Sequence, residues 1–514
     1  GYGNMWYDGS VAQYHLPKNS NTCPLYCAAL WIGGEDVNNQ LRIAALRFGQ
    51  NGDDFWPGPL KINGTASIDL PVCNYYDKHY VITKTEVLSF MEHFDYSGNT
   101  PVLVSELGTI PEVILNWPAK GEGDDLTSYL APFYDADHDG VYNPYNGDYP
   151  WYDFDNDLCP RTLKQRYPDR NSVRMPTMEE EAGIVQGGIL SDQVLKGDQT
   201  IWWVFNDMGN THTETDGHPI GLEIRAQAFA FSTNDKINDM TFYSYEIINR
   251  STYELTNTYF SQWVDPDLGN AQDDFVGCDV RRGLGYCYNG KAVDDPGAGS
   301  YSGIPPAVGI DFFQGPYMDA DGKDNPKIDI SYIKNSTNAP LKKLLEQYKV
   351  KKKGTTIDSV DAQGNQVYDT VDISYHADDF YAVDYKSWYF QPNDNIGNCA
   401  INGVNFGNGI VDDERFGMRR FVYYENKSNV DNGEPDKAND YYNYLQGKWR
   451  NQSRMTYGGN ALNTGTTSLE CDFMFPDDSD PWHWGTNGVI PSVIPDDWNE
   501  ITAGNSPSDR RFMQ

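Results

Sequence analysis

The stretch QTIWWVFND, at residues 199–207, decides the fold class, because it is an apolar run of strand length that ends in turn-forming residues. The next stretch, GLEIRAQAFAFS at 221–232, alternates so that every second side chain lies on one face of a strand. Two more strand-like stretches follow at short spacing, at 239–251 and 254–265. Strands joined by tight turns predict a mainly β fold with an antiparallel β-sandwich core, of jelly-roll or immunoglobulin-like type.

The composition of the 514-residue chain agrees with a folded, β-rich protein. Apolar residues make up 39% of the chain and aromatic residues 14%, whereas disordered chains are poor in aromatic residues. The high content of glycine (48 residues) and tyrosine (36 residues) favours strands and turns over helical bundles.

The charge balance excludes one class of partner and favours another. The chain has 39 Lys and Arg residues against 74 Asp and Glu residues, a net charge of -35. The electrostatic field of this negative charge repels a phosphate backbone, so we expect no nucleic-acid partner. The same field attracts divalent cations. No apolar run reaches the length of about 18 residues that a membrane-spanning helix needs, so we expect no transmembrane segment. No signal peptide is visible at Gly1, and we expect that one has been removed or that the sequence begins after it.

Eight cysteines are present, and none forms a CxxC pair, so a zinc ribbon is poorly supported. The even number is compatible with disulfides in an oxidising compartment. Two pairs are close enough in sequence to bridge locally, Cys278 with Cys287 and Cys23 with Cys27. The alternative is that several of the cysteines are buried free thiols.

The N-terminal region, residues 1–120, is expected to be β-rich with short helices. Its stretches 27–34 and 41–49, with their Gly-Gly and Asn-Asn pairs, suit a hairpin. In the stretch TKTEVLSFMEHF, Thr83 and Glu86 have the spacing of a capping box at the start of an apolar helix face.

Four further regions follow along the chain. We expect an acidic calcium-loop region at 121–198, the β-sandwich core at 199–337, an exposed Lys-rich hairpin insertion at 338–385 and a loop-rich C-terminal region at 386–514 that packs on the core. The insertion carries six lysines within 342–353. They form either a solvated face or a basic patch that docks a neighbouring acidic copy of the chain.

The acidic stretch YDADHDGVYNPYNGDYP, at 134–150, matches the opening of a calcium-binding loop. Asp135, Asp137 and Asp139 lie two residues apart, and Gly140 lets the chain bend sharply after the third carboxylate. Calcium takes oxygen ligands, and carboxylates in this spacing on a turning loop converge on one ion. The alternative is a solvated acidic loop without metal.

The remaining ligands of this predicted calcium site follow from the same spacing. The Val141 carbonyl and Asn143 come next, and Asn146 stands where an EF-hand has its closing Glu. Asp148, two residues later, would close the site instead. The pattern is typical of helix-free calcium loops of secreted proteins rather than of an EF-hand.

Other acidic fragments repeat parts of this pattern. In DADGKDNP, Asp319, Asp321 and Asp324 predict a second calcium loop. For the fragments at 264–279 and 405–414, Asx-turns without metal are an equal alternative.

Motifs for catalysis are weak. His212, Glu214 and His218 resemble transition-metal ligands, but the helix of an HExxH site is absent, and a polar loop is the simpler interpretation. Glycoside hydrolysis needs only two well-spaced carboxylates, which an acidic sequence does not exclude. Trp482 and Trp484 either stack on sugars or pack under loops.

Several stretches resemble a family of large secreted surface proteins of Bacteroidota. They are spread over most of the chain, at 134–150, 197–207, 221–231, 262–294, 309–319 and 405–421. The resemblance implies export by the type IX secretion route, whose C-terminal sorting domain is not seen before Gln514. It also implies O-glycosylation at Asp-Ser/Thr-apolar triplets, which Ser359 and Thr370 fit, both in the predicted insertion.

Taken together, these features predict an extracellular or outer-surface protein, stabilised by calcium, with a structural or adhesive role rather than an enzymatic one. Its expected partners are other copies of itself or other outer-surface proteins, and type IX secretion components during export. The alternatives are a glycan-binding or glycan-hydrolysing secreted protein, and a cargo or accessory component of the secretion machinery.

Overall fold

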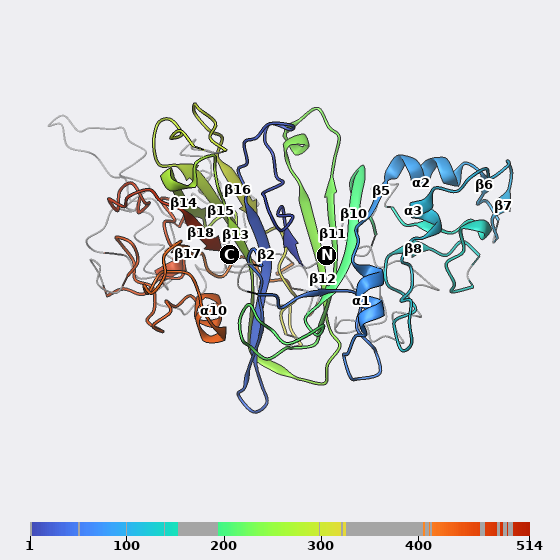
Figure 1. The fold of residues 1–514 in the computed structure, drawn as a ribbon, viewed down its shortest axis with the longest axis horizontal. Helices are drawn as coiled ribbons and strands as arrows, with labels where there is room; N and C mark the ends of the chain where they lie inside the picture. Colours follow the sequence, from blue (N-terminus) through green and yellow to red (C-terminus); the bar gives the residue numbers. More distant parts are fainter. Residues whose placement is uncertain are drawn as a thin grey trace, which may run out of the picture. The chain divides into compact units, whose positions relative to one another are not determined.

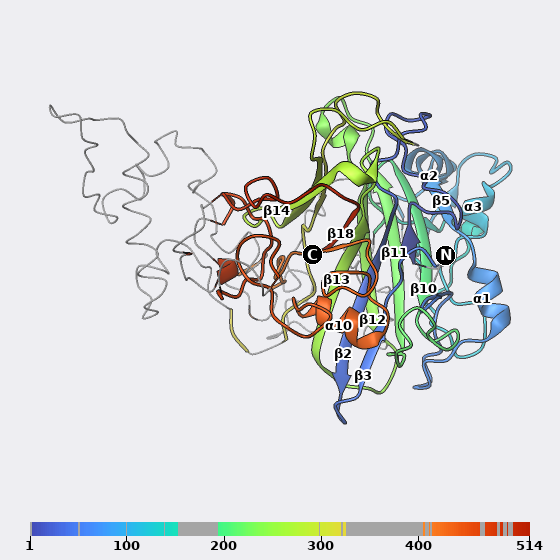
Figure 2. The same cartoon turned by 60° about the vertical axis from the view of Figure 1, so that its left-hand side comes forward.

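The computed structural model forms two compact units (Figures 1 and 2). The first unit comprises Gly1–Asn4 and Ile32–Thr258, and the second comprises Met5–Trp31 and Tyr259–Gln514. Strands far outnumber helices, which confirms the predicted mainly β fold. The pairing of sheets into a sandwich stays a prediction. The residues that the structure describes are 3–49, 52–98, 100–137, 139–152, 194–297, 299–319, 322–324, 405, 406, 411, 414–462, 468–480, 484–486, 491 and 497–514.

The first unit is built on a five-stranded antiparallel sheet around β10 (Gln199–Asn206). On one side β10 pairs with β11 (Leu222–Ala230), which in turn pairs with β12 (Phe242–Asn249). On the other side β10 pairs with β5 (Tyr80–Thr83) and with β4 (Trp56–Pro57). The strands predicted from the apolar run and from the first two stretches after it are therefore confirmed, and they are neighbours in one sheet.

Short helices and two-residue strands make up the rest of the first unit. Figure 1 shows α2, α3 and the strands β6 to β8 gathered in the blue-to-cyan part of the ribbon. The elements are α1 (Leu70–Tyr76), α2 (Lys84–Met91), α3 (Glu112–Leu115), the hairpin of β6 (Phe94–Asp95) with β7 (Val102–Leu103), the hairpin of β8 (Phe133–Tyr134) with β9 (Tyr149–Pro150), and the 3₁₀ turns η1 (Pro144–Asn146) and η2 (Lys236–Asp239).

The predicted capping box starts α2. The Thr83 hydroxyl oxygen accepts a hydrogen bond from the Glu86 backbone N–H at 3.2 Å, and the Glu86 carboxylate accepts one from the Thr83 N–H at 2.8 Å. Both donors would otherwise lack partners at the helix N-terminus. Val87 and Phe90 lie on the buried face of the helix, as its apolar periodicity predicted.

An aromatic core connects these small elements to the main sheet. Trp202 on β10 packs against Tyr80 and Trp117, with ring centroids 5.9 Å and 6.2 Å apart. The same core extends to Phe133 on β8 and Tyr149 on β9. Burial of each large apolar side chain contributes roughly 1.5–3 kcal/mol, so the β8–β9 hairpin is held firmly at its base. That hairpin carries the acidic loop.

A second, six-stranded sheet has the order β1-β2-β13-β18-β17, with β3 paired to β2, and the division between the two units falls within β2 and β13. β2 and β3 form the predicted antiparallel hairpin. The strands are β1 (Asn4–Met5), β2 (Cys27–Asp36), β3 (Leu41–Ala44), β13 (Leu255–Asp265), β17 (Val422–Glu425) and β18 (Arg510–Met513).

The second unit also holds a three-stranded antiparallel sheet and one longer helix. The sheet joins β14 (Asp274–Asp279), β15 (Leu284–Asn289) and β16 (Val308–Asp311). The helix is α10 (Ala438–Leu445), close to its predicted place but starting three residues after Pro435. Its Tyr441 ring packs edge-on against Trp31, at a centroid distance of 4.7 Å. Two 3₁₀ turns complete the described elements, η3 (Ala271–Asp273) and η5 (Trp484–Thr486).

The two predicted disulfides are wrong, because Cys23, Cys27, Cys278 and Cys287 are free thiols. Cys278 lies opposite Gly285 in the β14–β15 ladder and Cys287 lies opposite Val276, so the two cysteines are diagonal neighbours. Diagonal positions place Cβ atoms roughly 7 Å apart, beyond the roughly 3.5–4.5 Å of a disulfide. Between Cys23 and Cys27, Leu25 forms an antiparallel β-bridge with Tyr14, and the chain then enters β2. The Cys23 thiol donates hydrogen bonds to the carbonyl oxygens of Tyr14 and Leu25 rather than bonding to Cys27.

Some predictions lie outside the described residues. The Lys-rich insertion at 338–385, with the glycosylation candidates Ser359 and Thr370, is among them. Within the described part of the chain, no helix has the length and apolar character needed to cross a bilayer, in agreement with the prediction.

We predict that Thr83→Ala destabilises the start of α2. The substitution removes the hydroxyl that accepts from Glu86 N–H, and loss of a helix N-cap typically costs about 1 kcal/mol. Hydrogen exchange of the Glu86 amide should become faster, while amides in the middle of β10 keep their protection. Unchanged exchange at Glu86 would show that the capping box does not hold the helix end.

Candidate functional site

The candidate metal site lies on the loop that joins β8 to β9. Tyr134 and Tyr149 are paired in the hairpin, so Asp135 and Asp148, the residues next to them, leave the two strands side by side. One carboxylate oxygen each from Asp135, Asp137 and Asp148 lies within 4.8 Å of the others. The sequence placed these three residues in one calcium site, and the structure does bring them together.

Backbone N–H groups hold two of these carboxylates in place. Asp135 accepts hydrogen bonds from Gly140 N–H at 2.8 Å and from Asp139 N–H at 3.2 Å. Asp148 accepts from Ala136 N–H and from Asn143 N–H, both at 2.8 Å. The loop is thus folded around its own acidic side chains.

Burial makes the close approach of these charges costly. Asp148 is fully buried and Asp135 is 5% exposed. Burial and the neighbouring Asp135 and Asp137 carboxylates together raise the pKa of Asp148 to about 7, although the two N–H donors act in the opposite direction. Among the described residues, no Lys or Arg side chain forms an ion pair with any of the three. The charge of this cluster therefore has no protein counterion in the described part of the chain.

The other predicted ligands of this loop have different positions. The Asp139 side chain is exposed and accepts a hydrogen bond from Val141 N–H at 2.7 Å, so it does not belong to the converging group. Asn143 caps η1 by accepting from the Tyr145 N–H. The Val141 carbonyl stays a predicted ligand.

The second predicted calcium loop gains no support. Asp319 is exposed and Asp324 is half-buried, whereas Asp321 lies outside the described residues. In the described part of the chain, Asp319 and Asp324 belong to neither converging acidic group. A calcium ion at this loop stays a prediction.

A second acidic cluster, in the second unit, joins Asp265 and Asp267 at the end of β13 with Asp509 before β18. It differs from the first because Arg511 lies within it. The Arg511 Nε is 3.2 Å from Asp265 Oδ1 and 3.2 Å from Glu434 Oε1, and its guanidinium also contacts Asp509. A buried guanidinium is the counterion here, so this cluster is explained without a metal.

Sequence reasoning recognised the acidic fragment at 264–279 but missed Asp509. Asp509 approaches Asp265 only because β18 pairs with β13, with Val264 opposite Phe512. No local spacing signals such a contact. Burial and the nearby Asp509 raise the pKa of Asp267 to about 7.

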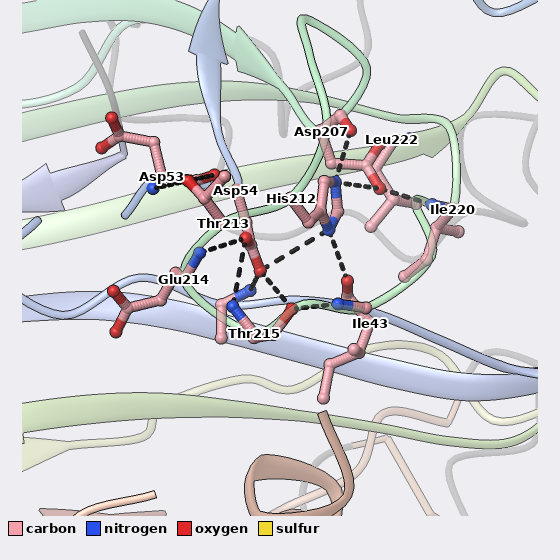
Figure 3. A network of polar contacts seen from close by, with 12 residues as sticks. Ile43, Asp53, Asp54, Asp207, His212, Thr213, Glu214, Thr215, Ile220 and Leu222 are labelled. Atoms are coloured by element: carbon pink, nitrogen blue, oxygen red, sulfur yellow. Dashed lines mark hydrogen bonds and ion pairs between the residues drawn. The ribbon is translucent and has the colours of Figure 1, made fainter. Parts of the chain in front are cut away.

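The third polar cluster surrounds His212 in the first unit (Figure 3). His212 Nδ1 lies 2.8 Å from the Ile43 carbonyl oxygen, and Nε2 lies 2.7 Å from the Asp207 carbonyl oxygen. Both ring nitrogens are thus engaged, and neither has a lone pair free for a metal ion. Glu214 forms an ion pair with Arg47, and His218 is exposed. The transition-metal interpretation of this stretch is not supported, and a polar loop fits.

Of the two tryptophans considered for glycan contact, the structure describes one. Trp484 is half-buried in η5, and Trp482 lies outside the described residues. Comparisons with models of protein families, with curated proteins and with solved structures find no match to this chain.

We predict a pH-dependent stability from Asp274, which is fully buried at the start of β14. Burial, and to a lesser extent the Asp267 carboxylate, raise its pKa to about 9. Between about pH 4 and pH 9, the folded state therefore binds one proton more at Asp274 than the unfolded state does. The free energy of unfolding should fall as pH rises through this range, by up to about 1.4 kcal/mol per pH unit.

Urea unfolding of Asp274→Asn from pH 5 to pH 9 should show a shallower fall than the unmodified protein. Asp497→Asn removes the same charge from an exposed site and should leave the slope unchanged. Equal slopes for Asp274→Asn and the unmodified protein would contradict the prediction.

Proposed function

We propose that the protein is a calcium-stabilised extracellular surface protein with a structural or adhesive role, exported by type IX secretion. The observation that carries the proposal is the convergence of the Asp135, Asp137 and Asp148 oxygens within 4.8 Å, without a Lys or Arg counterion among the described residues. The surface location and the type IX route rest instead on the resemblance of the sequence to secreted surface proteins of Bacteroidota.

The chemistry of the donor set fits calcium. All three groups are carboxylates, and hard oxygen donors are the ligands that calcium and magnesium prefer. Calcium accepts the irregular geometry of a flexible loop, whereas magnesium demands a near-ideal octahedron. A divalent ion between the carboxylates would offset their repulsion and allow Asp148 to ionise, and its binding would add stability to the folded state.

The burial of the cluster supports a stabilising role over a catalytic one. A glycosidase needs an acid and a base that both face the sugar. Asp148 is fully buried and Asp135 nearly so, which leaves no room for a sugar between them. An extracellular location suits such a site, because calcium modules with few carboxylates bind at about 0.1–1 mM and fill only where calcium is abundant.

We predict that calcium raises the melting temperature of the protein and that EGTA reverses the effect. Calcium at 100 times its dissociation constant would stabilise the folded state by about 2.7 kcal/mol, or roughly 5–10 °C for a unit of this size. Asp137→Asn should abolish most of the calcium-dependent shift in differential scanning calorimetry, because it removes one converging carboxylate.

Two variants give the calcium experiment its controls. Asp95→Asn removes the same charge from an exposed turn and should keep the full shift. Asp139→Asn tests the ligand set: a retained shift supports closure of the site by Asp148 without Asp139. An unchanged melting temperature of the unmodified protein in excess EGTA would overturn the proposed calcium site.

We further predict that the protein associates with copies of itself. A structural surface protein acts through assembly, so sedimentation velocity at high protein concentration with calcium should show species heavier than the 58.1 kDa chain. A single monomeric species under these conditions would count against the structural role and leave the calcium site untouched.

A further inference from the structure

The hydrogen bonds of His212 define its charge. A backbone carbonyl oxygen only accepts hydrogen bonds, and a neutral imidazole has a single N–H to donate. Contacts of 2.8 Å and 2.7 Å from the two ring nitrogens to carbonyl oxygens of Ile43 and Asp207 are therefore both hydrogen bonds only in the imidazolium. In either neutral tautomer, one nitrogen lone pair would face a carbonyl oxygen inside the protein, which is repulsive.

Two buried carboxylates flank the ring and supply the opposite charge. Asp54 Oδ2 is 3.5 Å from His212 Nδ1, and Asp207 Oδ2 is 4.0 Å from Nε2. Burial raises the pKa of both aspartates, but the histidine ring and hydrogen-bond donors act against that rise. Figure 3 shows the ring between the two aspartates.

The contacts of each aspartate are those of an ionised carboxylate. Asp207 accepts from the backbone N–H groups of Gly221 at 2.9 Å and Leu222 at 2.6 Å, and from that of Ile220. Asp54 accepts from the Thr215 hydroxyl at 2.7 Å and from the N–H groups of Glu214 and Ala45. An acceptor surrounded by donors is satisfied only without its own proton.

The other charged groups near the ring do not replace it as counterion. Arg47 and Glu214 form their own buried ion pair, and Arg42 on β3 pairs with Asp36. Asp53 is half-buried and adds negative charge beside Asp54. The Trp56 ring lies 5.8 Å from the imidazole, centroid to centroid, and helps to cover it. The described surroundings therefore hold an excess of negative charge that favours a cation at His212.

We propose that His212 is a buried imidazolium that works as a proton-dependent clasp, fastening the loop 207–221 to β3. The clasp is present while the ring carries both protons. When rising pH removes one, a lone pair faces a buried carbonyl oxygen and two buried carboxylates lose their counterion, so this attachment of the loop is lost. The hydrogen bonds from Arg42 to the Pro219 carbonyl and from Ile43 N–H to the His218 carbonyl remain. This device is independent of the calcium site and is not part of the proposed function.

The direct test is NMR spectroscopy of the full chain with ¹⁵N-labelled histidine. The His212 signal is assigned by its loss in His212→Gln. We expect both ring nitrogens of His212 to carry protons at about pH 7.5, at which free histidine in water carries only one. The exposed His15 and His218 serve as internal references. A single protonated nitrogen at His212 in neutral solution would overturn the proposal.

Hydrogen exchange separates the clasp from a merely structural histidine. Protection factors of the Gly221 and Leu222 amides, which donate to Asp207, should fall in the pH range where His212 loses its second proton. Asp54→Asn keeps the histidine but removes one counterion, and should move both the proton loss and the fall in protection to lower pH. His218→Gln, on the same loop, should move neither. If the protection factors of the Gly221 and Leu222 amides do not change when His212 loses its second proton, the proposed clasp is contradicted.

Discussion

Buried carboxylates are the constraint on which this structure depends. Taking an ionised carboxylate out of water costs several kcal/mol unless donors or an opposite charge replace the lost hydration. The chain nevertheless buries many aspartates, and several of them gather in three separate clusters. In the clusters of Asp135 and of His212, backbone N–H groups point at the acidic oxygens. In the cluster of Asp265, the Arg511 guanidinium takes this role.

The three clusters differ in the cation that balances them. Arg511 lies among Asp265, Asp509 and Glu434, and the ring of His212 lies between Asp54 and Asp207. The Asp135 loop has neither arrangement in the part of the chain that the structure describes. The proposed divalent ion would be the same physical solution applied a third time, and it would account for the crowding of Asp135, Asp137 and Asp148. This contrast, more than the spacing of the aspartates, separates a metal loop from a solvated acidic loop.

Local patterns in the sequence were sufficient for the strands and for the start of α2. The run that forms β10 and the alternation in β11 follow directly from burial on a sheet, and Thr83 with Glu86 signals a helix start within four residues. Asp135 and Asp148 were placed together by the ligand spacing of a calcium loop, in which Asp148 lies two residues after the closing position. Asp509 and Asp54 were missed because only the pairing of strands brings them to Asp265 and to the loop of His212. The prediction of local disulfides was wrong for the opposite reason, because cysteines close in sequence were expected to be close in space. The register of β14 and β15 places Cys278 and Cys287 at diagonal positions of the ladder.

Anomalous diffraction from crystals grown with calcium is the most direct measurement of the central claim. The account predicts an anomalous peak between the carboxylates of Asp135, Asp137 and Asp148, with oxygen atoms at about 2.3–2.6 Å from it. The absence of a peak at full calcium saturation, with the three carboxylates in the same close arrangement, would mean that protons and N–H donors suffice to hold them and would contradict the account.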